Sequence, residues 1–301
     1  MNAVGEKNFT FFRILNIAIL ALFTFVCFYP IWYVFINSMS TGAAVSRGVY
    51  VVPISFTLEA YLEVFKLDGL VRAAGNSFVR SVAGPALSML LAAMLGFLFT
   101  NRFMPCRKLI YRYFVVTMYV SGGLIPSYII NSKLGFRNNF LVYIIPGCLS
   151  AWSMIMYKTF LESMDCMPVV ESAEIDGAGL VQTFIHVVLP LTKPILACFF
   201  IFGAVGAWND WFTNFIYISG PRGQGLNVIA FLLYRLMQSA VAASGAKGAD
   251  DMAYLAERAS KVSPLTLRMA MSVVTMIPIM CVYPLMQKYF ASGFMLGAIK
   301  G

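Results

Sequence analysis

The stretch Glu171–Pro190, ESAEIDGAGLVQTFIHVVLP, lies between two long apolar runs of the chain, and its first half is polar. Residues 171–175 are compatible with a helix, and Asp176-Gly177 signals a turn because glycine accepts a positive φ angle. Apolar residues then recur at helical spacing: Leu180, Phe184, Val187 and Val188. The connection over about 161–188 is therefore predicted to form a helix, a sharp turn and a second helix along a membrane surface.

The composition around this stretch excludes a soluble domain. The chain has 301 residues, of which 60% are hydrophobic and 12% are charged, and its mean hydropathy is +0.78. A soluble domain of this length needs far more polar surface. The formal net charge of +9 belongs mostly to basic residues between apolar runs, so nucleic-acid binding is not indicated.

Six apolar runs have the length that crosses a hydrocarbon core of about 30 Å. They cover about Phe11–Ile36, Ser77–Phe99, Leu109–Ile130, Phe140–Phe160, Leu189–Ile218 and Leu265–Phe290. Backbone groups in lipid must bond within their own segment, so the runs are predicted to be helices. We expect an all-α, polytopic bundle of six transmembrane helices that forms one domain over residues 1–301. The first run is too long for a cleavable signal and is expected to stay in the protein.

The loops set the expected orientation. The densest cluster of basic residues in a short loop is Arg102, Arg107, Lys108 and Arg112. Such clusters favour the cytoplasmic side, so both termini are predicted to be cytoplasmic. The loops over about 38–72 and 219–264 are then extracytoplasmic. The small, charged segment 239–263 within the second loop is expected to be a short surface helix or an insertion.

Other chemistry is not indicated. The six cysteines are scattered without a CxxC pair, and a single histidine is too few for a histidine-rich metal site. No P-loop of the form G-x-x-x-x-G-K-[ST] occurs. We therefore expect no catalytic residue, metal or cofactor on this chain, and energy for any active transport has to come from another chain.

Taken alone, the 161–188 loop could equally be a hairpin that only connects two spans or a docking surface for a soluble partner.

The pattern of Glu171-Ser172-Ala173, then Gly177, then Leu189-Pro190 resembles the EAA loop of binding-protein-dependent ABC importers. Ser172 departs from the family, which usually has alanine there, but serine is also small. The resemblance implies that this loop is a cytoplasmic coupling helix that sits in a groove of a separate ATPase. The coupling residues that it implies are Glu171, Ser172, Ala173, Asp176, Gly177, Ala178, Leu189 and Pro190.

The resemblance to this family covers about residues 10–301. Within the family, the sequence is similar to the carbohydrate-uptake branch, which includes the smaller maltose-type permease subunit. It includes Pro190–Pro194, Trp208-Asn209 and the tail Gln287–Gly301, and Gly122–Pro126 resembles an oligosaccharide subgroup that includes uronic acids. It implies a place in the bacterial cytoplasmic membrane, a homologous second permease subunit, two ATPase subunits that bind ATP and Mg²⁺, and an extracytoplasmic solute-binding protein.

The fifth apolar run offers candidate solute contacts. Sugars bind through hydroxyl hydrogen bonds and by stacking on aromatic rings, and this run contains Trp208, Asn209, Asp210, Trp211 and Asn214. An ionisable residue such as Asp210 inside a span usually faces the protein interior. These residues are predicted to line the solute pathway, although an aromatic belt and a hydrogen bond between helices would give the same pattern.

Three alternatives stay open. An ion-coupled secondary transporter needs charges inside the membrane, and we identify only Asp210 as a strong candidate. A non-transporting scaffold could use the loop only to dock a partner. An ABC permease could also carry a different solute, either an anionic oligosaccharide or a non-sugar, since the outer loops hold more basic than acidic residues.

Overall fold

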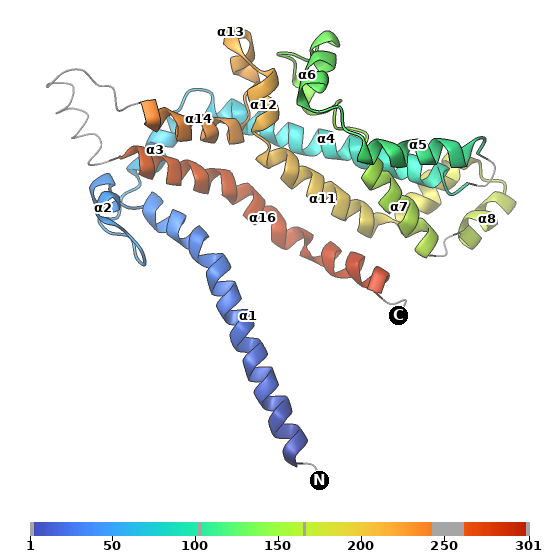
Figure 1. Cartoon of the computed structure of the whole chain (residues 1–301), viewed down its shortest axis with the longest axis horizontal. Coiled ribbons are helices and arrows are strands. Elements are labelled where there is room, and N and C mark those ends of the chain that lie inside the picture. The colour runs from blue at the N-terminus through green and yellow to red at the C-terminus, as the bar shows by residue number, and fades with distance from the viewer. Residues whose placement is uncertain (1–2, 102–103, 165–166, 243–261, 299–301) are drawn as a thin grey trace. The chain divides into compact units, whose positions relative to one another are not determined.

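The computed structural model describes residues 3–101, 104–164, 167–242 and 262–298, and helices dominate these ranges (Figure 1). The chain forms two compact units. One combines Met1–Asp68 with Arg235–Ile277, and the other combines Gly69–Tyr234 with Pro278–Gly301. Within the described residues, the one β pairing is an isolated bridge between Ser40 and Phe56. The all-helical class is therefore as expected.

The first unit contains a long apolar helix, α1 (Ala3–Ser38), whose side chains are exposed from Phe12 to Phe28. A helix that is apolar all round suits a lipid or partner-helix environment. The chain after α1 folds back onto its C-terminal end, where Asn37 Nδ2 donates to the Val49 carbonyl at 3.1 Å. Two short helices, α2 (Gly42–Arg47) and α3 (Glu59–Phe65), therefore give structure to the predicted 38–72 loop.

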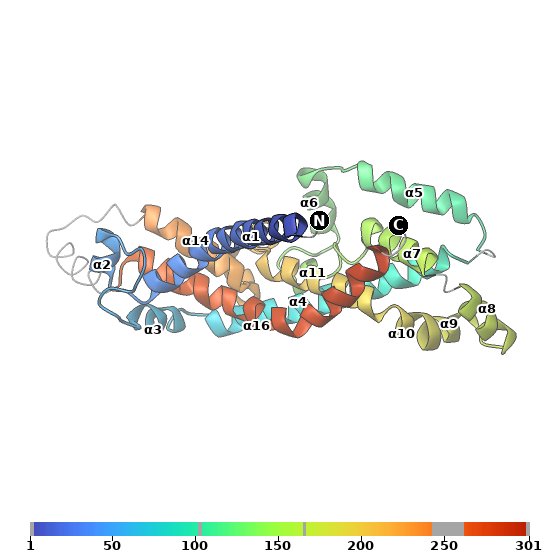
Figure 2. The same ribbon diagram turned by 90° about the horizontal axis from the view of Figure 1, so that it is seen from below.

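The second unit is built on α4 (Leu70–Leu98), which packs against α7 (Ala151–Ser163) and α11 (Lys193–Asn209), as Figures 1 and 2 show. Gly96 permits the close approach of α7, because a Cβ atom there would lie 2.7 Å from Cδ1 of Tyr157. On α11, a Cβ atom at Gly203 would lie 3.0 Å from Cβ of Pro85. Small residues thus set the helix spacing in this unit.

Further helices lie outside the connection between α7 and α11. They are α5 (Arg107–Tyr119), α6 (Leu124–Lys133), the 3₁₀ turn η1 (Phe140–Tyr143), α12 (Phe212–Tyr217), α13 (Gly220–Gly223), the 3₁₀ turn η3 (Gln224–Leu226), α14 (Ile229–Ala242) and α16 (Pro264–Ala298). Residues 243–261 of the predicted insertion at 239–263 lie outside the described residues, as does Cys166.

Among the described residues, three helices are long and apolar enough to cross a membrane: Phe12–Ser38, Leu70–Leu98 and Pro264–Pro284. They correspond to the predicted first, second and sixth spans. Two further runs qualify only as bent pairs. Arg107–Tyr119 and Leu124–Lys133 meet at 117°, and Leu180–Leu191 and Lys193–Asn209 meet at 79°. Length and composition therefore support three to five spans.

Three of the six predicted runs are interrupted in the structure. Over 140–160, the chain forms a 3₁₀ turn and then α7, because Pro146 and Gly147 interrupt the helix. With 13 residues, α7 is about 20 Å long, which is shorter than a hydrocarbon core. The third run breaks before Gly123, whose φ is +82°, and the fifth breaks at Thr192 and at Asp210.

Candidate functional site

The connection between α7 and α11 contains four short elements. They are α8 (Met167–Ile175), α9 (Leu180–Thr183), the π-helix η2 (Phe184–Val188) and α10 (Leu189–Leu191). The turn after α8 has Gly177 at φ +84°. The Gly177 N–H donates to the Glu174 carbonyl at 3.0 Å, and the Ala178 N–H donates to the Ala173 carbonyl at 2.9 Å. This pair of bonds is a Schellman cap with glycine at its left-handed position.

The same segment presents a mixed polar and apolar surface. Glu171, Ser172 and Asp176 are exposed, while Ala173 and Ala178 are half-buried. Ile175 is 86% exposed. Exposed apolar residues beside exposed carboxylates are typical of a surface that meets another protein.

The base of the connection is anchored in the core of the second unit. Val170 of α8 and Phe184 and Val188 of η2 are buried in one cluster with Phe97 of α4 and Tyr157 of α7. The Phe97 and Phe184 rings stack with their centroids 5.6 Å apart. Displacement of α8 therefore has to displace side chains that pack on α4 and α7.

A buried hydrogen bond reinforces this anchor. The Tyr157 hydroxyl lies 2.7 Å from the Thr192 hydroxyl, at the bend between α10 and α11. Thr192 Oγ1 also donates to the Val188 carbonyl at 2.8 Å. The start of α11 is thus tied both to α7 and to η2.

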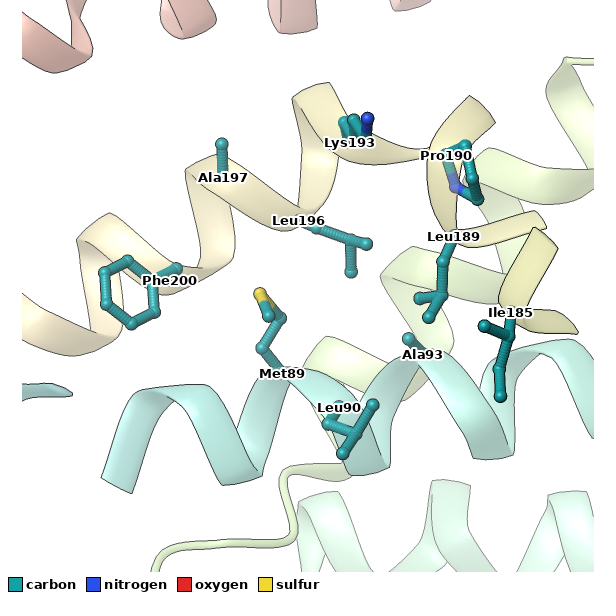
Figure 3. Close-up of a pocket in the computed structure, with 10 residues that line it drawn as sticks. All are labelled: Met89, Leu90, Ala93, Ile185, Leu189, Pro190, Lys193, Leu196, Ala197 and Phe200. Atoms are coloured by element: carbon teal, nitrogen blue, oxygen red, sulfur yellow. The ribbon is translucent and has the colours of Figure 1, made fainter. Parts of the chain in front are cut away.

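Leu189 and Pro190 lie apart from the exposed surface of α8. They line an apolar groove of about 540 Å³ between α11 and α4, together with Met89, Leu90 and Ala93 among others (Figure 3). Lys193 is the one charged residue in the lining. The predicted coupling residues therefore form two groups, one around the Gly177 turn and one beside the groove.

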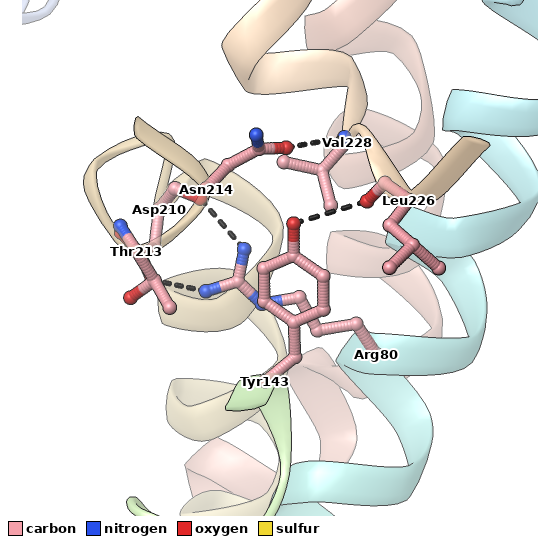
Figure 4. Close-up of polar contacts among 7 residues, drawn as sticks. All are labelled: Arg80, Tyr143, Asp210, Thr213, Asn214, Leu226 and Val228. Carbon is pink, nitrogen blue, oxygen red and sulfur yellow. Dashed lines mark hydrogen bonds and ion pairs between the residues drawn. The ribbon is translucent and has the colours of Figure 1, made fainter. Parts of the chain in front are cut away.

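A polar cluster marks the other end of α11 (Figure 4). Arg80 of α4 is buried and forms an ion pair with the Asp210 carboxylate, and its Nη1 donates to the Asp210 carbonyl at 2.7 Å. The guanidinium carbon lies 4.5 Å from the centroid of the Tyr143 ring. The Asp210 carboxylate also accepts from the Thr213 N–H at 3.0 Å and from the Thr213 hydroxyl at 2.6 Å.

The predicted pathway residues have internal contacts. Trp208 is buried, and the Asn209 side-chain amide donates to the Val205 carbonyl at 3.0 Å. The side chain of Asn214 is buried and accepts from the Val228 N–H at 2.9 Å. Trp211 stacks on Tyr234 with centroids 4.0 Å apart, so one face of its ring is covered.

Sequence reasoning missed Arg80. Asp210 was expected to be the one strong intramembrane charge, yet Arg80 lies inside the second apolar run. The sequence did contain a signal for this ion pair, because one apolar run contains an arginine and another contains an aspartate, and buried charges need partners. Phe212 and Phe215 of α12, which follow Asp210, have exposed aromatic rings. In the described part of the chain, no three His, Cys, Asp or Glu side chains gather as metal ligands.

Comparison with known proteins identifies the family. No protein-family model matches the chain. The chain is 31% identical over 291 residues to the polygalacturonan/rhamnogalacturonan transport system permease protein YtcP of Bacillus subtilis (strain 168). This alignment covers 96% of the chain and 98% of YtcP. The chain is an ABC importer permease. It is a transport subunit, and no bond chemistry is assigned to it.

Solved structures agree with this assignment. This permease superposes on a chain of a bacterial ABC transporter involved in the import of the acidic polysaccharide alginate with a TM-score of 0.80 and 26% identity, over 93% of this chain and 97% of the other. A chain from the alginate transporter in complex with an alginate pentasaccharide-bound periplasmic protein matches with a TM-score of 0.53 and 16% identity, over 93% of each chain. The second match shows a shared fold.

Proposed function

We propose that this permease moves an oligosaccharide across the bacterial cytoplasmic membrane, after a solute-binding protein delivers it on the outer side. The whole of residues 1–301 would serve as one permease domain with six membrane passes. It would pair with a homologous permease and with two ATPase subunits, which would bind ATP and Mg²⁺. The mechanism would be alternating access, in which closure of the ATPases moves the coupling loop and the helices attached to it.

The observation that carries this proposal is the construction of the connection between α7 and α11, which contains the predicted coupling loop at about 161–188. Its Schellman cap fixes the turn at Gly177, and its exposed face contains Glu171, Ser172 and Asp176. Its base is packed on α4 and α7 through Val170 and Phe184. A loop that is exposed at one end and packed into the core at the other can transmit a displacement, so we assign it the coupling role. The groove residues Leu189 and Pro190 would join the loop to α11.

An acidic oligosaccharide is the solute class that we favour. The polygalacturonan/rhamnogalacturonan permease and the alginate importer are both named for acidic polysaccharides. The predicted outer loops hold more basic than acidic residues, which supports attraction of a polyanion. Near Asp210, the exposed rings of Phe212 and Phe215 offer apolar faces for stacking of sugar C–H groups. Asn209 and Trp211 would complete this wall of the pathway.

Reconstitution tests the function. The permease would be assembled with its partner subunits in vesicles, with the binding protein outside and ATP inside. We expect ATP-dependent uptake of a labelled oligogalacturonide that is faster than uptake of a neutral maltooligosaccharide of equal length. Uptake driven by an ion gradient without ATP would contradict the proposal. Preference for the neutral sugar would keep the importer but reject the acidic solute class.

A further inference from the structure

The two ends of α11 are held by different contacts, and the contact at its far end has no assigned role. With 17 residues, α11 is about 25 Å long. Its first residue follows Thr192, which bonds to Tyr157 at the base of the coupling loop. Its last residue precedes Asp210, which bonds to Arg80 of α4. The helix therefore connects the coupling loop with the Arg80–Asp210 pair.

Asp210 is the joint between two helices. Its backbone is extended, with φ −78° and ψ 102°, between the end of α11 and the start of α12. Its carbonyl, near the end of α11, accepts from Arg80. Its carboxylate accepts from the Thr213 N–H in the first turn of α12. Arg80 thus holds groups that belong to both sides of the break.

Arg80 is itself well fixed. It is 3% exposed and lies over the Tyr143 ring, whose hydroxyl donates to the Leu226 carbonyl at 3.0 Å. Nearby on α4, the Asn76 side-chain amide donates to the Gly225 carbonyl at 3.0 Å, and Ser77 accepts from the Ile229 N–H at 2.9 Å. Because α4 also bonds to the chain around 225–229, the position of Arg80 is fixed. Arg80 can therefore hold the backbone of Asp210, where α11 ends and α12 begins, in place relative to α4.

We propose that Arg80 is a positioning residue for transport, which anchors the far end of α11 through Asp210. With this end held to α4, movement of the coupling loop reorients α11 relative to α4 and so changes the pathway beside α12. Without the Arg80–Asp210 contact, the coupling loop still moves, but the chain bends at Asp210 and α12 does not follow the movement of α11. The inference rests on the proposed import function, and it assigns Asp210 to the anchor and not to solute contact.

The readout is the coupling ratio, defined as solute molecules imported per ATP hydrolysed by the complete reconstituted importer. For Arg80→Gln and for Asp210→Asn, we expect the ratio to fall by about tenfold, the scale of an energetic coupling of one to two kcal/mol. The apparent KM for the solute should stay unchanged. Arg80→Lys keeps the charge and is expected to recover part of the ratio. Arg112→Gln, the same substitution at an exposed position of α5, should leave the ratio unchanged.

A buried arginine without its partner can prevent assembly, so the double variant Arg80→Gln/Asp210→Asn removes both charges. We expect it to assemble in wild-type amounts and to keep a lowered ratio. Equal losses of ATP hydrolysis and uptake, with the ratio unchanged, would reduce Arg80 to a structural role and overturn the proposal. A raised KM at an unchanged ratio would also overturn it, in favour of solute contact. Failure of the wild-type importer to take up any oligosaccharide would instead reject the proposed function.

Discussion

Gly177 has φ +84°, and no heavy atom lies within 4 Å of the place that a Cβ atom would occupy. Gly177→Ala therefore tests backbone conformation without a steric clash. An L-residue in this conformation costs about 1–2 kcal/mol, so the cap that ends α8 should be populated less. We expect the binding-protein-stimulated ATPase rate of the reconstituted importer to fall by about fivefold.

Gly179→Ala is the matched control at the residue scale. Gly179 also has open space around it, but its φ of −72° suits any residue. We expect the stimulated rate of this variant to equal that of the wild type. Equal losses in the two variants would show that the left-handed turn has no special role in coupling.

At the scale of elements, the contact between α4 and α7 depends on Gly96. A Cβ atom there would lie 2.7 Å from Tyr157 Cδ1 and 3.1 Å from the Met154 carbonyl oxygen. Because backbone atoms stand in the way, Gly96→Ala should separate the helices and destabilise the unit by about 1–3 kcal/mol. The measurement is the Tm of the purified complex in detergent, which we expect to fall.

Gly75→Ala makes the same change on the same helix where nothing lies within 4 Å. Alanine is favoured over glycine in a helix by about 0.5–1 kcal/mol, so the Tm of this variant should stay the same or rise slightly. A fall of the same size in both variants would mean that the α4–α7 contact does not require glycine.

At the same scale, hydropathy found the apolar runs but not their interruptions. Runs 109–130 and 189–218 are predominantly apolar, yet each contains a sharp bend. The bend at Thr192 is held by the hydroxyl of Tyr157, which is 35 residues away in sequence. A residue pattern within one run cannot report a partner from another helix, and so the bend at Thr192 was missed. The break before Gly123 has a local cause, the positive φ angle of that glycine.

At the scale of the whole molecule, orientation can be tested by labelling single cysteines. In a variant that lacks the six native cysteines, Ile175→Cys lies on α8 and Val52→Cys lies in the predicted outer loop. Both side chains are exposed, at 86% and 62%. A membrane-impermeant maleimide should modify the residue 52 variant in intact spheroplasts and the residue 175 variant only after the membrane is opened. The reverse pattern would place the coupling loop outside.

The sequence alone determined the membrane class, the helical fold class and the family. Backbone groups in lipid must bond within their own helix, so the lengths of the apolar runs are sufficient to predict a helical membrane protein. The family is identified by a contiguous motif, residues 171–190. It also located the Gly177 turn, because glycine and its capping carbonyls are neighbours in sequence. The tertiary structure alone decided which polar residues in the spans pair with one another. Arg80 and Asp210 are 130 residues apart, and only the packing of α4 against α11 brings the charge of one to the charge of the other.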